Sequence, residues 1–185
     1  MMRTAGTLLL AVVLIAPAAG GDKTTVTLDG LKSDVPPAWK TKTSPFKTRL
    51  YTFTVPKAEG DERETEVQII SFGKDNDGGG LAANIKRWKG MFDAPEGKTI
   101  DDVSKQETFN VGPAKVTTLD IQGIYLDKFP PFDPNAKTIR RPDYRRINVF
   151  FDSEGGTYFI IFIGPAKTVA QNKKAFDDWL KGFKK

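Results

Sequence analysis

The stretch that decides the fold is Thr157-Tyr158-Phe159-Ile160-Ile161-Phe162-Ile163, which contains no charged residue. Its large apolar side chains stand at both odd and even positions, and successive side chains of a strand point to opposite faces of a sheet. A strand with two apolar faces is typical of the middle of a sheet that is covered on both sides. This segment therefore predicts a layered domain with residues 157–163 at its centre.

The strands around this segment are predicted to pair locally. The turn sequence Ser153-Glu154-Gly155-Gly156 joins it to a preceding apolar strand, and Gly112-Pro113 joins another pair. Because short connections of this kind link antiparallel neighbours, we expect a mostly antiparallel sheet. The predicted strands are residues 24–28, 49–55, 66–72, 107–111, 115–125, 146–151 and 157–163. Residues 129–146 are rich in proline and predict a long loop.

Two amphipathic helices are predicted from apolar side chains at helical spacing. The first stripe is Leu81, Ile85, Trp88 and Phe92, and the second is Val169, Asn172, Phe176, Trp179, Leu180 and Phe183. The second helix is expected to begin near Thr168, because Thr168 and Gln171 match a capping box. Each helix has one apolar stripe, which predicts that it packs against one face of the sheet.

These elements predict an α+β fold, with a mostly antiparallel sheet of about six to seven strands covered by two main amphipathic helices. A chain of 185 residues has room for one domain, and no internal repeat divides it. We expect a single α+β domain over residues 35–185, preceded by a lead-in segment at residues 21–34.

Residues 1–20 predict a secretory signal peptide. A short head with one charge, Arg3, precedes an apolar run from Leu8 to Ile15 and a cleavage-site sequence, Ala16-Pro17-Ala18. A buried helix and an uncleaved membrane anchor are the alternatives, but the run is shorter than the about 20 residues of a membrane span. We therefore expect a soluble exported protein, periplasmic or extracellular, with no stable membrane span after cleavage.

Histidine and cysteine are both absent from the sequence, which excludes several kinds of chemistry. The chain has no Ser-His-Asp triad, no histidine-ligated metal, no thiol nucleophile, no disulfide and no thiolate zinc site. No cofactor is expected. The formal net charge of +5 is modest, and the acidic pairs Asp101-Asp102 and Asp177-Asp178 argue against a nucleic-acid partner.

Three segments of the chain are distinctive. They are Gly78-Gly79-Gly80 leading into Asn84-Ile85-Lys86-Arg87-Trp88, the strand around Tyr158-Phe159, and the run from Gly164 to Val169. Together they resemble an uncharacterised family of exported bacterial proteins, often lipoproteins, whose arrangement is similar to the PsbP-like α/β/α sandwich. The resemblance implies this sandwich, but no activity and no functional residue. The chain departs from the family in lacking a lipid-anchor cysteine, so we expect no lipid anchor.

The loop at residues 75–80 is the densest candidate for ligand chemistry. Asp75 and Asp77 resemble the start of a calcium-binding EF-hand loop, but Lys86 stands where that loop needs a bidentate glutamate. The glycines alternatively allow backbone N–H groups to converge on an anion at a helix N-terminus. A solvated connection without a ligand is the third interpretation.

Residues from two regions are candidates for ligand binding. They are Gly79, Gly80, Asn84, Arg87, Arg140, Arg141 and Tyr144. The first four surround the start of the first helix, where Asn84 and Arg87 have the alternative role of orienting the helix on the sheet. The last three belong to residues 137–146, where basic side chains surround a tyrosine. That run favours an anionic envelope polymer or a lipid headgroup, with a solvated loop as the alternative.

The sequence favours a binding protein over an enzyme. Glu64 and Glu66 lie on one face of a predicted strand at a separation of roughly 7 Å, the spacing of a carboxylate pair in an inverting glycosidase. They would, however, lie on the same side of a substrate. We therefore expect an exported, non-enzymatic binding or envelope-associated domain whose partner is an envelope protein or an anionic polymer. The alternative is a carboxylate-based hydrolase or a calcium-dependent module that uses the Asp75–Asp77 loop.

Overall fold

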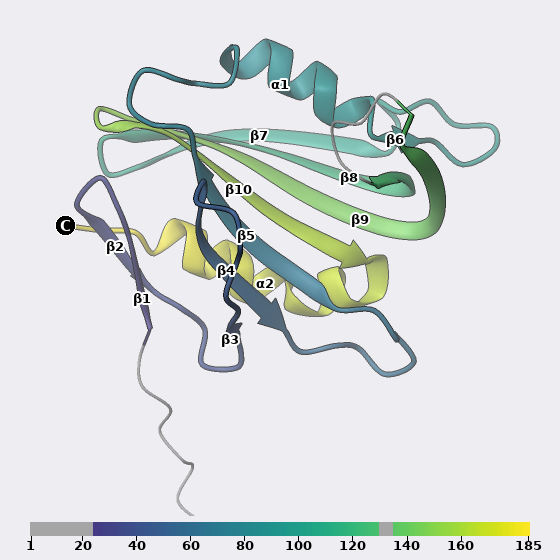
Figure 1. Ribbon diagram of the computed structural model, residues 1–185, viewed down its shortest axis with the longest axis horizontal. Helices are drawn as coiled ribbons and strands as arrows, with labels where there is room; N and C mark the ends of the chain where they lie inside the picture. Colours follow the sequence, from purple (N-terminus) through teal and green to yellow (C-terminus); the bar gives the residue numbers. More distant parts are fainter. Residues whose placement is uncertain (1–23, 130–134) are drawn as a thin grey trace, which may run out of the picture.

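A central antiparallel sheet lies between two helices in the computed structural model, which describes residues 24–129 and 135–185 (Figure 1). The predicted signal peptide at residues 1–20 lies outside the described residues. The helices are α1 (Gly80–Lys89) and α2 (Ala166–Lys181), and they cover opposite faces of the sheet. In the described residues, no helix has the length and apolar character needed to cross a membrane.

Eight of the ten described strands form the main sheet, in the order β3-β4-β5-β10-β9-β8-β6, with β7 also paired to β8. The remaining two, β1 and β2, form a separate hairpin. The strands are β1 (Thr25–Leu28), β2 (Leu31–Asp34), β3 (Lys40–Thr41), β4 (Arg49–Val55), β5 (Thr65–Ser71), β6 (Phe92–Asp93), β7 (Ser104–Val111), β8 (Ala114–Phe129), β9 (Lys137–Ser153) and β10 (Gly156–Pro165). Every strand pairing in the described residues is antiparallel, which confirms the predicted α+β class.

Strand β10 occupies the middle of the sheet, as residues 157–163 predict. It pairs with β5 on one side and with β9 on the other. Phe159 belongs to the core under α1, whereas Ile160 and Phe162 belong to the core under α2. The two apolar faces of this strand therefore correspond to two separate cores, one on each side of the sheet.

The two predicted helix stripes face these cores. Phe176 and Trp179 of α2 are buried against β10 and Trp39. Trp88 of α1 is buried, and Phe92 joins it from β6, because α1 has already ended at Lys89. We refer below to the two sides of the sheet as the α1 face and the α2 face.

The β1–β2 hairpin packs beside the end of α2. Val26, Leu28 and Leu31 are almost completely buried in the core of the α2 face. The Ser33 hydroxyl donates a hydrogen bond of 2.7 Å to the backbone oxygen of Trp179. Part of the segment that we described as a lead-in therefore contributes to the core of the domain.

The prediction of a long loop at residues 129–146 is wrong for most of that range. Strands β8 and β9 form a ribbon that runs out to Phe129 and Lys137, and residues 130–134 lie outside the described part. Pro142 is accommodated at an irregularity in the pairing, next to Asp143 with φ of 53°. The prediction failed because the outer ribbon is charged and exposed and lacks the apolar alternation of a half-buried strand.

The capping box predicted at Thr168 is also wrong. Helix α2 begins at Ala166, and its N-cap is Pro165. The Thr168 hydroxyl instead donates to the Asp61 carboxylate and accepts a hydrogen bond of 2.9 Å from the Ala58 N–H. These bonds join the β4–β5 loop to the start of α2.

Candidate functional site

An open pocket with a volume of about 440 Å³ lies on the α1 face of the sheet, where β5, β8, β9 and β10 meet. We call it the tyrosine pocket. Its lining residues are Arg63, Glu64, Glu66, Tyr125, Asp127, Arg141, Tyr144, Ile163 and Gly164. The pocket joins two groups that the sequence analysis treated separately, the carboxylates at Glu64 and Glu66 and the basic run that contains Arg141 and Tyr144.

A bend in the β8–β9 ribbon places the two tyrosines together. The register of the ribbon shifts between Gly123 and Tyr125, and Figure 1 shows the outer ribbon curling towards β6 and the end of α1. At the bend, a Cβ atom on Gly123 would lie 2.7 Å from the backbone oxygen of Asp93, so only glycine fits there. The rings of Tyr125 and Tyr144 stack with their centroids 6.0 Å apart and an interplanar angle of 13°.

Arg141 forms one wall of the pocket. Its Nε atom donates a hydrogen bond of 2.7 Å to the Asp127 carboxylate, and both side chains are largely buried. Its guanidinium carbon lies 6.0 Å from the centre of the Tyr144 ring. Burial raises the pKa of Tyr144 above its usual value, because the charged phenolate is poorly solvated there. Tyr144 is therefore a neutral, stacked ring at neutral pH.

Arg146 lies next to the tyrosine pair as a buried cation. Only 7% of the residue is exposed. Its Nε atom donates to the Asn148 side-chain oxygen at 2.7 Å, and one terminal nitrogen approaches the Met91 sulfur at 3.0 Å. Burial lowers the pKa of Arg146, and the Tyr125 phenol opposes that effect. Among residues 24–129 and 135–185, Arg146 has no carboxylate partner within ion-pair distance.

Asn148 adds a second unsatisfied group at this place. The residue is completely buried, and its side-chain nitrogen has no hydrogen-bond partner within the described part of the chain. A buried polar group without a partner costs free energy, and a buried charge without a counter-charge costs more. Two such groups side by side are typical of a functional site.

Glu64 and Glu66 lie at the opposite rim and share one lysine. The Lys42 ammonium donates to Glu64 at 2.7 Å and to Glu66 at 2.8 Å. Desolvation alone would raise the pKa of Glu66, but hydrogen bonds from Lys42 and Gln68 lower it overall. The two carboxylates raise the pKa of Lys42 in return. Glu66 and Lys42 are therefore both charged at neutral pH.

The Glu66 contact predicts a pH dependence of stability. A carboxyl whose pKa is lower in the folded than in the unfolded protein stabilises the fold above its unfolded pKa, and this stabilisation is lost as the pH falls through the folded value. We expect the wild type to be more stable than Glu66→Gln at pH 7, with the difference shrinking between about pH 5 and about pH 2. Urea unfolding of both proteins at several pH values measures this difference. A difference that stays constant over that range would contradict the prediction.

The Gly79–Arg87 group lies elsewhere, at the start of α1. The Asn84 amide nitrogen donates to the backbone oxygens of Gly78 and Gly80. Arg87 donates to the Asn84 side-chain oxygen at 2.7 Å and to the Gly78 oxygen at 3.1 Å. These bonds fasten the glycine loop to the helix. Because α1 has ten residues and so spans about 15 Å, this group and the tyrosine pocket lie towards opposite ends of it.

Asp75 and Asp77 lie in the same exposed loop. Asp77 accepts a hydrogen bond of 3.0 Å from the Gly79 N–H. Within the described ranges, no group of three or more acidic side chains is arranged to hold a metal ion. The remaining candidate, Arg140, lies on the outer ribbon and forms an ion pair with Asp93 of β6.

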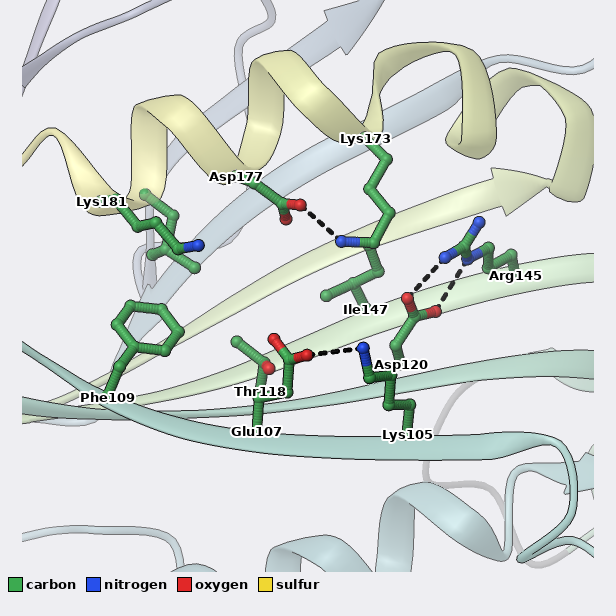
Figure 2. A pocket seen from close by; sticks show the side chains of 11 residues that line it. Lys105, Glu107, Phe109, Thr118, Asp120, Arg145, Ile147, Lys173, Asp177 and Lys181 are labelled. Carbon is green, nitrogen blue, oxygen red and sulfur yellow. Dashed lines mark hydrogen bonds and ion pairs between the residues drawn. The ribbon is translucent and has the colours of Figure 1, made fainter.

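A second, charged groove lies on the α2 face, between α2 and strands β7 to β9 (Figure 2). Its volume is about 150 Å³. Arg145 holds the Asp120 carboxylate with two hydrogen bonds of 2.8 and 2.6 Å. Separate ion pairs join Lys105 to Glu107 and Lys173 to Asp177. The acids and bases of this groove largely neutralise one another.

Sequence reasoning missed three lining residues of the tyrosine pocket, Arg63, Tyr125 and Asp127, and it missed the burial of Arg146 beside them. Tyr125 falls at the end of a predicted strand, and its stacking on Tyr144 depends on the bend at Gly123. Arg146 was included in the basic run, but its burial was not foreseen. The available signal was the position of Arg146 two residues before Asn148 in an apolar strand, which places both polar side chains on one covered face.

Similarity to known proteins is found in the overall structure alone. No protein-family model matches the chain, and no curated protein matches it. The solution structure of CyanoP, the cyanobacterial PsbP of Synechocystis sp. PCC 6803, is similar with a TM-score of 0.49 and 14% identity, over 92% of this chain and 98% of that chain. The crystal structure of a Pseudomonas aeruginosa protein of unknown function has a TM-score of 0.47 and 12% identity, over 87% of this chain and 95% of that one.

Proposed function

We propose that the protein is an exported, non-enzymatic domain that binds an anionic glycan in the tyrosine pocket. The observation that carries this proposal is Arg146, a buried guanidinium that has no carboxylate partner among the described residues and that contacts Tyr125. A bound carboxylate or phosphate group would provide the counter-charge. The stacked tyrosines and the charged rim of the pocket would then contact the rest of the glycan.

The electrostatics of Arg146 favour an anion. Removing a guanidinium from water is expensive, and in most proteins a carboxylate offsets that cost. Here Asn148 and Met91 provide only neutral contacts. Arg146 lies beside the pocket and is not one of its lining residues, so its charge acts on a bound anion through the electric field, which a low-dielectric surrounding strengthens. Asn148 adds an unpaired N–H donor beside the same group.

The shape and chemistry of the pocket favour a sugar. Tyr125 and Tyr144 present a pair of stacked rings, and aromatic rings combine a large apolar surface with a polar tip. Arg141, Asp127 and Glu66 surround them with donors and acceptors that suit hydroxyl groups. A pocket with an apolar floor and a few placed polar groups is typical of a small-ligand site.

The acidic side chains of the pocket favour binding over hydrolysis. A glycosidase needs one carboxyl with a raised pKa as its general acid, and the pKa of Glu66 is lowered. Glu64 and Glu66 also bind the same Lys42 ammonium, so both are engaged on one side of the pocket. Carboxylate oxygens held in this way are suited to accepting hydrogen bonds from sugar hydroxyls.

The test compares Arg146→Met with the wild type in calorimetric titrations with an oligogalacturonate. Methionine keeps most of the volume and removes the charge, so stability should be unchanged or higher. Affinity should fall about 10- to 100-fold, because the buried positive charge beside the bound anion is lost. Lys174→Met is the matched control, since it removes one exposed positive charge from α2, on the other face of the sheet. It should bind like the wild type.

Two further ligands test whether the pocket requires a negative charge and whether that charge must be carried by a sugar. The fully methyl-esterified oligogalacturonate keeps the sugar rings and should not bind. Vesicles of phosphatidylglycerol carry phosphate without a sugar polymer and should bind more weakly than the acidic glycan. Equal binding of the neutral ester, tighter binding of the vesicles, or full affinity in folded Arg146→Met would each refute the proposal.

A further inference from the structure

Strand β7 leaves a long part of one edge of the main sheet unpaired. Within the described part of the chain, β7 pairs with β8 alone. The opposite edge of the sheet is better covered, because β3 pairs with β4 at Thr54 and Phe53 and the Lys42 N–H donates to the Thr52 oxygen. An unpaired strand edge presents a row of free N–H and C=O groups that another strand can use.

The pairing with β8 shows which backbone groups of β7 are free. Val111 pairs with Ala114 across the two-residue turn between β7 and β8. The backbone N–H and C=O groups of Val111, and of every second residue before it, therefore point towards β8. The bond from the Gln122 N–H to the Val103 oxygen fits this alternation. Gln106, Thr108 and Asn110 therefore direct their backbone groups away from the sheet, and all three are exposed.

The charges on β7 are complementary to those of a second copy. Lys105 and Glu107 stand on the same face of the strand, on either side of Gln106. If two copies of β7 pair antiparallel about a two-fold axis at Gln106, Lys105 of each copy lies opposite Glu107 of the other. This is the close, non-hydrogen-bonded type of pair, in which opposite charges stabilise the pairing.

The neighbouring two-fold registers are less favourable. An axis at Glu107 places two glutamates opposite each other, and an axis at Thr108 places Glu107 opposite Phe109. In the single chain, Lys105 and Glu107 bind each other at 2.7 Å, with their side chains 76% and 50% exposed. An exposed ion pair of this kind contributes little to stability. Breaking it in each copy to form two ion pairs between the copies therefore costs little.

We propose that two copies of the chain associate through β7, antiparallel and centred on Gln106, to form one continuous sheet. The Gln106 N–H of each copy would donate to the Gln106 oxygen of the other. The Thr108 N–H would donate to the Ser104 oxygen. On the α2 face, the charged groove of each copy (Figure 2) would open beside this junction, because Lys105 and Glu107 line it. Each dimer would carry two tyrosine pockets.

Sedimentation velocity over about a hundredfold range of concentration tests the proposal, because mass action makes dimerisation concentration-dependent. We expect the wild type to dimerise. Lys105→Glu and Glu107→Lys should each weaken association about tenfold or more, because each places like charges opposite each other. The double variant K105E/E107K exchanges the two signs and should recover wild-type association.

Two further proteins keep the test independent of folding. Gln106→Pro removes an N–H that is free in the single chain, so it should leave the monomer folded and abolish the dimer. Lys174→Glu reverses an exposed charge on α2, away from β7, and should dimerise like the wild type. A wild type that stays monomeric throughout, or a folded double variant that associates no better than the single variants, would overturn the proposal.

Discussion

Replacement of Phe176 by alanine is expected to lower the free energy of unfolding by about 3–5 kcal/mol. Phe176 is completely buried in the core of the α2 face. Its ring lies 4.9 Å from that of Phe162, 5.8 Å from that of Trp179 and 6.4 Å from that of Trp39. Alanine would leave a cavity between α2, β10 and the segment around Trp39, and these rigid rings have little freedom to fill it.

Urea unfolding measures the loss, and Phe46→Ala is the matched control. Phe46 is 53% exposed, and its main recorded ring contact is with Arg49, so its removal should cost less than about 1 kcal/mol. Because a domain of this size is stable by only about 5–15 kcal/mol, the Phe176 variant should begin to unfold at much lower urea. Similar losses for the two variants would contradict this description of the core.

Gly164→Ala is expected to cost about 3 kcal/mol, at the upper end of the usual cost of overpacking. Gly164 lies in β10 beside Thr65 of β5. A Cβ atom at this position would lie 2.0 Å from the Thr65 hydroxyl oxygen and 2.7 Å from its Cβ atom. Rotation of the Thr65 side chain relieves only the first clash. Strands β5 and β10 must therefore separate to accept the methyl group.

The Gly164 variant should also weaken binding in the tyrosine pocket, which Gly164 lines together with Glu66. Thermal and urea unfolding give the change in stability, and G164A/T65G should recover most of it, because the clashing atoms are removed. Gly90→Ala is the control: its added Cβ would lie 3.5 Å from the nearest atoms, an ordinary contact. A Gly164→Ala protein as stable as Gly90→Ala would contradict the close approach.

The layers of the fold were predictable because they depend on periodic apolar patterns. Residues 157–163 predicted the central strand, and the stripes at Trp88 and Phe176 predicted one helix for each face. These patterns are local, and burial of apolar surface determines their meaning. Over the described ranges, the main sheet has eight strands where about six to seven were predicted, since β3 and β6 have only two residues each and carry no pattern of their own.

The outer β8–β9 ribbon was not predictable in this way. Its residues are held by pairing along the ribbon and by ion pairs such as Arg141–Asp127. The basic side chains of β9 pair with acidic side chains of β8 that are distant in the sequence. In the sequence, the basic residues of β9 therefore look like a run without a pattern. Pro142 lies at an irregularity in the pairing, where a missing N–H is tolerated.

The sequence determined the composition of the site but not its location. The absence of histidine and cysteine excludes their chemistry whatever the fold. Tertiary structure decided which charges meet, because an ion pair depends on proximity in space and the chain brings Lys42 to Glu66 and Arg141 to Asp127 from distant positions. It also decided that Arg146 is buried with no counter-charge among the residues that the structure describes, since burial is a property of the layers above a residue and not of the residue itself.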